Sequence, residues 1–91
     1  VTTSVNELSL QNQFSVYPNP FSVETTLKIN RNCKNATLTV YNSFGQQVKQ
    51  IKNIYGQTII LQRDNLSSGL YFIRLTEDNK IISADKLVIT D

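Results

Sequence analysis

The sequence has no histidine and a single cysteine, Cys33, which limits the chemistry open to it. One thiol cannot form an internal disulfide, and without histidine the usual zinc and transition-metal sites cannot be built. Long apolar runs are also missing, since none approaches the ~20 residues needed to span a bilayer. We therefore expect no metal, no cofactor and no membrane insertion.

Groups that carry catalysis are equally scarce. No histidine is present to act as a base, and Cys33 has no base beside it in the sequence. Acidic residues such as Asp64 and Glu77 fall in or beside predicted turns with no opposing carboxylate, whereas glycosidases require two carboxylates at a set separation. The glycines are isolated and form no phosphate-cradling run. We expect that the chain is not an enzyme.

Acidic residues are absent from the middle of the chain, between Thr25 and Arg63. A basic stretch of this kind suits an anionic partner such as lipopolysaccharide or nucleic acid. However, its cations are spread over several segments and lack the interleaved aromatic residues of a base-stacking surface. We therefore expect a solvated surface and no nucleic-acid partner. The basic residues are Lys28, Arg31, Lys34, Lys49, Lys52 and Arg63.

Apolar residues recur with period two, which is the pattern of half-buried strands. With 91 residues the chain forms one small domain, able to bury roughly 60–65% of its unfolded surface. No stretch shows a helical period, so the predicted class is all-β. The residues predicted to face the core are Leu27, Ile29, Ala36, Leu38, Val40, Ile59, Leu61, Tyr71, Ile73 and Leu75.

Turn signals recur about every 8–12 residues, the spacing of a β-sandwich. We therefore predict about seven short strands in an immunoglobulin-like antiparallel β-sandwich, without the paired cysteines and buried tryptophan of antibody domains. Residues 30–35 are predicted to form a polar loop that holds Cys33 as a tolerated free thiol or, alternatively, a reactive one. Gly45 is expected to take a positive φ in a hairpin turn. The opposite parity of Val48 and Ile51 predicts a bulge or an early end of the strand.

The first 13 residues are polar and weakly periodic, and we interpret them as a linker from a preceding cargo domain. Residues 14–91 form the predicted sandwich. Because the sequence does not begin with methionine, we expect a fragment whose export signal lies on the parent protein.

Two motifs have local structural explanations. In Tyr-Pro-Asn-Pro-Phe, residues 17–21, Pro18 and Pro20 fix their own φ, while Asn19 can bond the local backbone. The other motif is Leu-Ser-Ser-Gly-Leu-Tyr, residues 66–71. Its Gly69 supplies a backbone conformation that a residue with a Cβ adopts only at a cost in free energy. Tyr71 is expected to bury its ring while its hydroxyl reaches a backbone partner, as in the tyrosine corner of sandwiches.

Four motifs together are more specific than any one of them. After residues 17–21 come Tyr-Asn-Ser-Phe-Gly-Gln-Gln-Val at 41–48, Leu-Ser-Ser-Gly-Leu-Tyr and an apolar strand at 66–75, and Lys-Leu-Val-Ile at 86–89. In this order and spacing they resemble the type A C-terminal sorting domain of cargo proteins of the bacterial type IX (Por) secretion system. The chain departs from the family pattern where Thr90 and Asp91 follow the apolar triplet.

The resemblance implies a domain that directs an N-terminally fused cargo protein through the periplasm and across the outer membrane. Its partners are then the outer-membrane secretion machinery and a sortase-like protease that cuts in or just before residues 1–13. The cargo ends at the cell surface, linked to an anionic lipopolysaccharide, or outside the cell. We expect a monomer.

Lys86–Ile89 form the strand on which the predicted recognition site is centred. An edge strand that is apolar on both faces offers unpaired backbone groups to a partner strand. The predicted sorting-signal residues are Pro18, Asn19, Pro20, Gly45, Gly69, Tyr71, Lys86, Leu87, Val88 and Ile89. The alternative is an accessory module that binds carbohydrate or protein, with Tyr41, Phe44, Tyr55 and Phe72 as candidate stacking platforms.

Overall fold

The computed structural model describes residues 14–91, and this part of the chain consists of strands and the turns between them. Every pair of neighbouring strands is antiparallel. None of these residues forms a helix long and apolar enough to cross a membrane. The predicted linker, residues 1–13, lies outside the described residues. The strands are β1 (Ser15–Tyr17), β2 (Glu24–Asn42), β3 (Gln47–Gln62), β4 (Gly69–Glu77) and β5 (Lys80–Ile89).

The all-β class is confirmed, but five strands replace the seven predicted. The difference arises because β2 and β3 each run on through a segment predicted as a break. Residues 30–35 remain inside β2, where Cys33 points into the core and register shifts between Lys28 and Ala36 accommodate a bend. In β3 the corresponding bend includes Gly56, at φ +93°. The prediction of a loop at residues 30–35 is therefore wrong.

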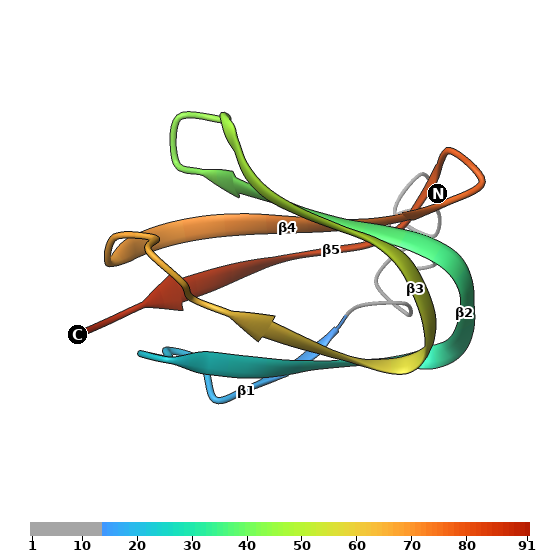
Figure 1. The fold of residues 1–91 in the computed structure, drawn as a ribbon, viewed down its shortest axis with the longest axis horizontal. Helices are drawn as coiled ribbons and strands as arrows, with labels where there is room; N and C mark the ends of the chain where they lie inside the picture. The colour runs from blue at the N-terminus through green and yellow to red at the C-terminus, as the bar shows by residue number, and fades with distance from the viewer. Residues whose placement is uncertain (1–13) are drawn as a thin grey trace, which may run out of the picture.

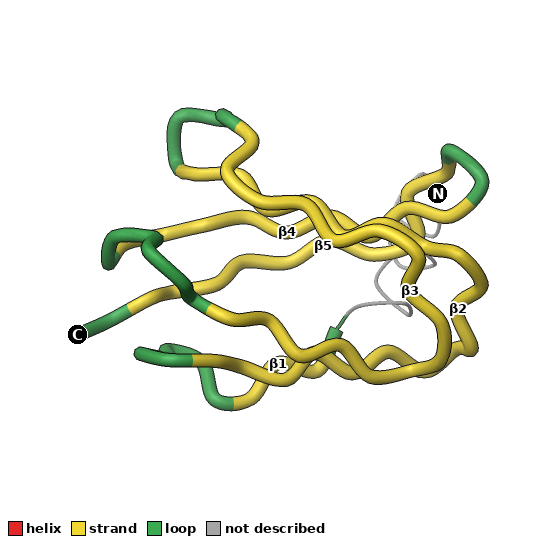
Figure 2. Tube along the Cα trace, viewed as in Figure 1, coloured by secondary structure: helices red, strands yellow, loops and turns green. Residues whose placement is uncertain are grey.

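Bending lets one sheet fold over itself around the core (Figures 1 and 2). The first half of β2 pairs with β1 and with the second half of β3. Its second half pairs with the first half of β3 and with β4, and β5 lies beyond β4. The two halves of β3 are joined across the open side by the ammonium of Lys49, which donates to the Gln62 carbonyl at 2.9 Å and pairs with Asp64.

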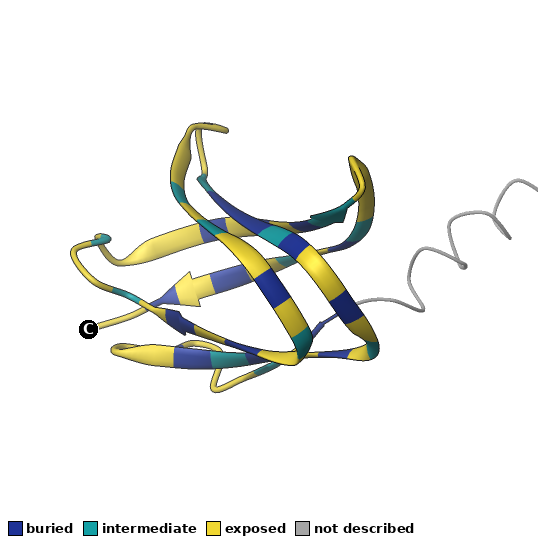
Figure 3. Cartoon of the chain, turned by 45° about the vertical axis from the view of Figure 1, so that its right-hand side comes forward, coloured by how far each residue is buried: buried dark blue, intermediate teal, exposed yellow. Residues whose placement is uncertain are grey.

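The core lies between the two halves of the curled sheet, and all ten predicted core residues are buried. Figure 3 shows buried and exposed positions alternating along β4 and β5, as period two requires. The sequence analysis did not include six further buried apolar residues in its core, and these come from the edges, the bends and the last strand. They are Phe14, Phe21, Cys33, Ile54, Leu87 and Ile89.

The β2–β3 turn has the predicted geometry. Gly45 takes φ +84°, and its amide donates to the Asn42 carbonyl at 3.0 Å. The Asn42 side-chain oxygen accepts from the amides of Phe44 and Gln46, both at 3.0 Å. The predicted bulge is also confirmed, because the register passes from Val40–Lys49 to Tyr41–Gln47 and leaves Val48 as the extra residue.

Candidate partner-recognition surface at the motif end

The four motifs gather at one end of the molecule, where the C terminus also lies (Figure 1). We call this end, residues 17–22, 42–48, 63–71 and 86–91, the motif end. The opposite end, residues 29–36, 53–57 and 77–80, contains the bends of β2 and β3 and is called the bend end. Hydrogen bonds between distant segments hold the motif end together.

The first motif binds the last strand. The Phe21 amide donates to the Val88 carbonyl at 3.0 Å, and the Thr90 amide donates to the Phe21 carbonyl at 2.9 Å, which makes a short parallel bridge. The Phe21 side chain is 2% exposed and completes the core there. Asn19 extends the contact, because its side-chain oxygen accepts from the Val88 amide at 3.0 Å. Asn19 thus bonds the backbone of a distant strand, whereas the sequence analysis expected a local bond.

These bonds correct the prediction of an open edge on β5. The Lys86 carbonyl accepts from the Asn19 side-chain nitrogen at 3.5 Å, and the Lys86 amide donates to the Asp85 carboxylate at 2.7 Å. Together with the Phe21 bridge, they give partners to the backbone groups of the strand from the Lys86 amide to the Thr90 amide. Within residues 86–89, Leu87 and Ile89 point into the core, and Lys86 and Val88 present their side chains to solvent.

Arg63 joins three segments of the motif end and was not among the predicted site residues. Its guanidinium donates to the carbonyls of Leu66, Ser22 and Thr90 at 2.9, 3.1 and 3.3 Å. It also pairs with the Asp91 carboxylate at 2.8 Å. The planar fork of five N–H donors suits arginine to such convergent acceptors. Nothing in the local sequence pattern signals this role, since the acceptors are mostly backbone atoms.

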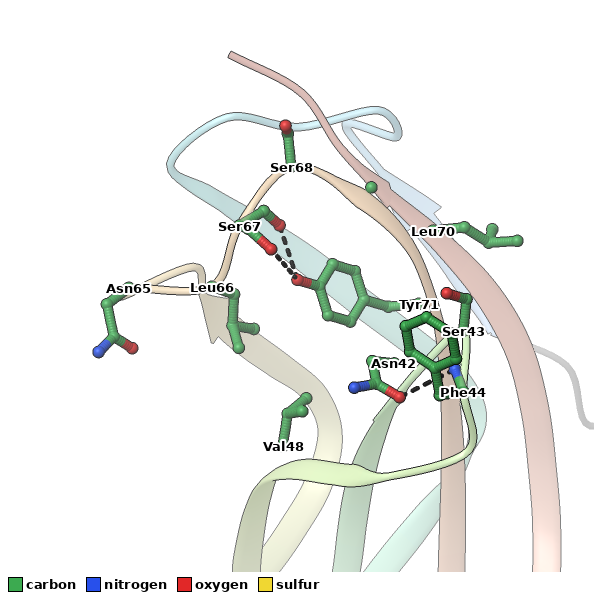
Figure 4. A pocket seen from close by; sticks show the side chains of 11 residues that line it. Asn42, Ser43, Phe44, Val48, Asn65, Leu66, Ser67, Ser68, Leu70 and Tyr71 are labelled. Atoms are coloured by element: carbon green, nitrogen blue, oxygen red, sulfur yellow. Dashed lines mark hydrogen bonds between the residues drawn. The ribbon is translucent and has the colours of Figure 1, made fainter.

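The third motif behaves as predicted. Gly69 takes φ +148°, a value that residues with a Cβ rarely adopt. The Tyr71 ring is 5% exposed, and its hydroxyl donates to the Ser67 carbonyl at 2.6 Å. This bond ties the loop before β4 to the core (Figure 4).

A cleft of about 480 Å³ separates the second motif from the third. Its lining contains no charged residue, and Tyr71 forms part of its wall (Figure 4). Leu70 belongs both to this cleft and to the outward side of β4. Leu70 therefore connects the rim of the cleft with the outer surface of β4 and β5.

On that outer surface, exposed apolar side chains lie next to one another. Leu70 is 42% exposed and pairs with Val88, which is 37% exposed. Phe72, 39% exposed, pairs with Lys86. Leu70 and Phe72 lie on the side of β4 opposite Tyr71. Leu70 was not among the predicted site residues, and Phe72 was named only as a candidate stacking residue of the alternative function. The same period-two pattern that predicted Tyr71 to be buried could have indicated that its neighbours Leu70 and Phe72 face outward.

The family is established by comparison. Residues 15–90 match the model of the family described as the secretion system C-terminal sorting domain, the sorting domain of type IX secretion. The chain belongs to this family. Membership implies that the parent of this sorting domain is secreted to the cell surface or beyond.

A solved structure supports the fold. The sorting domain is similar to part of PorZ, an essential bacterial surface component of the type IX secretion system of Porphyromonas gingivalis. The TM-score is 0.68 at 13% sequence identity, and the match covers 86% of this chain and 11% of that one. At this identity the similarity shows the fold alone, and the sorting domain spans only about a ninth of that chain. A comparison with curated proteins found no significant match.

The candidate stacking residues of the alternative reading do not form one platform. Phe44, 87% exposed, lies in the β2–β3 turn at the motif end, whereas Tyr55 lies at the bend end. Tyr41 and Phe72 are cross-strand neighbours, but the Arg74 guanidinium lies 5.0 Å from the centre of the Tyr41 ring and covers part of it. These four rings therefore do not form one row on which a glycan could stack.

Cys33 is a buried core residue of the sorting domain. Burial raises the pKa of its thiol, the nearby Glu77 carboxylate raises it further, and Arg31 partly opposes them. Both main causes disfavour the thiolate, which is the reactive form. The environment thus favours the reading of Cys33 as a tolerated thiol.

Proposed function

We propose that this domain directs a fused parent protein across the outer membrane through the type IX secretion machinery. The observation that carries the proposal is the match of residues 15–90 to the sorting-domain family. The contacts of the motif end support it, because the matching motifs lie together at this end and the first and third bond the last strand. The curled sheet is also compatible with an immunoglobulin-like sandwich whose two layers share β2 and β3.

Recognition, on this proposal, occurs at the motif end. Lys86 and Val88 present the last strand to a partner, while Gly69 and Tyr71 fix the loop behind it. The remaining motif residues hold the segments of this surface in position. Pro18, Asn19 and Pro20 hold Phe21 against β5, and Gly45 closes the turn beside the cleft; Leu87 and Ile89 anchor the strand in the core.

Processing follows transport in this proposal. A sortase-like protease removes the domain at a site in or just before residues 1–13, and the parent protein stays attached to the cell surface. This step is supported by the family resemblance. Mass spectrometry of the surface-attached product checks it, because cleavage leaves a new C terminus upstream of Phe14.

The test of transport is a fusion of residues 1–91 to a neutral folded reporter with an export signal. We expect the reporter at the surface of a host that has the type IX system and in the periplasm of an otherwise identical host that lacks it. A reporter without the domain is the matched control. Equal surface display in both hosts, or periplasmic retention in both, would refute the proposal.

Deletion of residues 86–91 is a poor test of recognition, although it removes the proposed signal. It also takes Leu87 and Ile89 out of the core and removes the partners of Phe21 and Asn19. A retained fusion then reports lost folding as readily as lost recognition. Substitutions of side chains on the outer surface separate the two.

A further inference from the structure

The outward side of β4 and β5 carries exposed apolar side chains and two cations, of which Arg74 donates through its guanidinium to the Tyr41 hydroxyl on β2. We define the outer face as Leu70, Phe72, Arg74, Ala84, Lys86 and Val88, which form three cross-strand pairs. Leu70 and Val88 make its apolar end, next to the cleft, and Arg74 and Ala84 its other end. Phe72 and Lys86 lie between them.

The charges on this face all have one sign. Arg74 and Lys86 are its only ionisable residues, and no carboxylate of residues 14–91 forms an ion pair with either. Glu77 is engaged by the Arg31 guanidinium at 2.5 Å and by the Lys34 amide at 2.6 Å. Asp85 accepts from the Lys86 backbone amide. The carboxylates of β4 and β5 thus accept hydrogen bonds from other groups and form no ion pair with Arg74 or Lys86.

The two cations lie on the same side of the β4–β5 ladder. Arg74 pairs with Ala84 and Phe72 pairs with Lys86, so Arg74 and Lys86 occupy diagonal positions, which lie about 7–8 Å apart. The Arg74 guanidinium is turned towards Tyr41 on β2 and donates to its hydroxyl, which leaves its other N–H groups as donors. Two positive charges without a carboxylate partner attract an anionic group. The face is therefore complementary to an anionic group flanked by apolar ones.

We propose that the outer face docks an acidic protein segment whose carboxylates contact Arg74 and Lys86 while its apolar side chains cover Phe72, Leu70 and Val88. This inference rests on the proposed sorting function and names the chemistry of the partner in it. A protein is favoured over a lipid surface because the apolar side chains lie in a pleated sheet face and are only about two-fifths exposed. Such side chains suit contact with another packed surface.

Charge reversal in the reporter fusion tests the inference. Arg74→Glu with Lys86→Glu should slow surface display roughly tenfold, because reversed charges repel the acidic segment. Arg74→Lys with Lys86→Arg keeps both charges and should restore display to near the wild-type rate. Lys28→Glu with Lys52→Glu changes the net charge equally at exposed positions outside this face and should have little effect. Thermal unfolding of each variant shows that the fold is retained.

The partner is then identified by contact. A photo-crosslinking phenylalanine analogue at position 72 should label a protein segment rich in Asp or Glu, and the label should disappear in the charge-reversed variant. Display of that variant at the wild-type rate overturns the inference, as does equal slowing by the control pair. A label on lipopolysaccharide or on a basic segment also overturns it. Failure of the wild-type fusion to reach the surface instead defeats the underlying sorting proposal.

Discussion

The motif end and the bend end solve the same problem by different means. At both ends the chain must pass between the two halves of the curled sheet. At the motif end the chain breaks into separate segments, and Asn19, Phe21 and Arg63 join them through bonds to backbone atoms. At the bend end β2 and β3 continue without a break, and their register shifts absorb the curvature.

The two ends also differ in whether buried polar side-chain atoms have hydrogen-bond partners. Among residues 14–91, two buried side-chain atoms lack a hydrogen-bond partner, the Nε of Arg31 and the Oγ of Ser83, and neither belongs to the motif end. Arg31 lies at the bend end. Ser83 lies in the first half of β5, where it pairs with Leu75, and is therefore outside the motif end. The motif end, where the family motifs lie, thus contains neither of these unpaired atoms.

The largest expected effect comes from breaking the core contact of the motif end. Tyr71→Ala removes a buried ring and the bond to the Ser67 carbonyl, and should lower the free energy of unfolding by about 3–5 kcal/mol. Tyr71→Phe removes only the hydroxyl and should cost about 1 kcal/mol. Urea unfolding measures both. Equal losses from the two substitutions would show that the hydroxyl, rather than the ring, holds this end.

Arg63 provides the second test. Arg63→Ala leaves the carbonyls of Ser22, Leu66 and Thr90 without this donor and should destabilise the domain by about 2 kcal/mol, since several bonds to a charged group are lost at a partly solvated site. Hydrogen exchange should accelerate at Phe21 and Thr90 but not at the bend end.

A matched substitution separates charge from geometry at this position. Arg63→Lys keeps the charge but lacks the planar fork, so we expect it to recover less than half of the lost stability. Full recovery would mean that the positive charge alone, and not the convergence of donors, fixes these segments.

The sequence predicts local features far better than contacts between distant segments. Period two and turn chemistry located the core, Gly45, the Val48 bulge and Tyr71, because these depend on neighbours a few residues away. The continuity of β2 through residues 30–35 was missed, since polar composition resembles a loop when the burial of Cys33 is unknown. Arg63 and the covered edge of β5 were missed for a different reason: their partners are distant backbone atoms, which have no side-chain pattern.

Asn19 tests the covered edge more narrowly. Asn19→Ala removes the acceptor for the Val88 amide and should cost about 1 kcal/mol. Asn19→Asp retains an acceptor there and should cost less. Exchange of the Val88 amide, followed by NMR, should accelerate in the alanine variant and remain slow in the aspartate variant. Unchanged exchange in both would show that the Phe21 bridge alone protects this strand.

An effect of the opposite sign is expected away from the motif end. Ser83→Ala removes a buried hydroxyl that lacks a partner among residues 14–91, so the free energy of unfolding should rise by up to about 1 kcal/mol. Thermal unfolding measures the change. A loss of stability would place an additional hydrogen bond at this hydroxyl and weaken the contrast between the two ends.

The smallest effect concerns the Cys33 thiol and pH. Burial raises its pKa above the ordinary value of 9.0, so the folded protein keeps a proton that the unfolded chain loses at high pH. The stabilising contribution is complete below the unfolded pKa and is lost as pH rises through the folded one. Urea unfolding of the wild type and of Cys33→Ala between about pH 8 and 10 should show a wild-type stability that falls more steeply. Parallel curves would contradict this.

The bridge between Phe21 and the last strand has a consequence for the order of synthesis. Asn19 leaves the ribosome 69 residues before Val88, the residue whose amide it binds, and Phe21 waits almost as long for its partners. Contacts of such large sequence separation form late in folding. Since Leu87 and Ile89 also fill the core, a chain that stops short of them leaves the first motif without its counterpart. The domain can therefore complete its fold only after β5 has been translated.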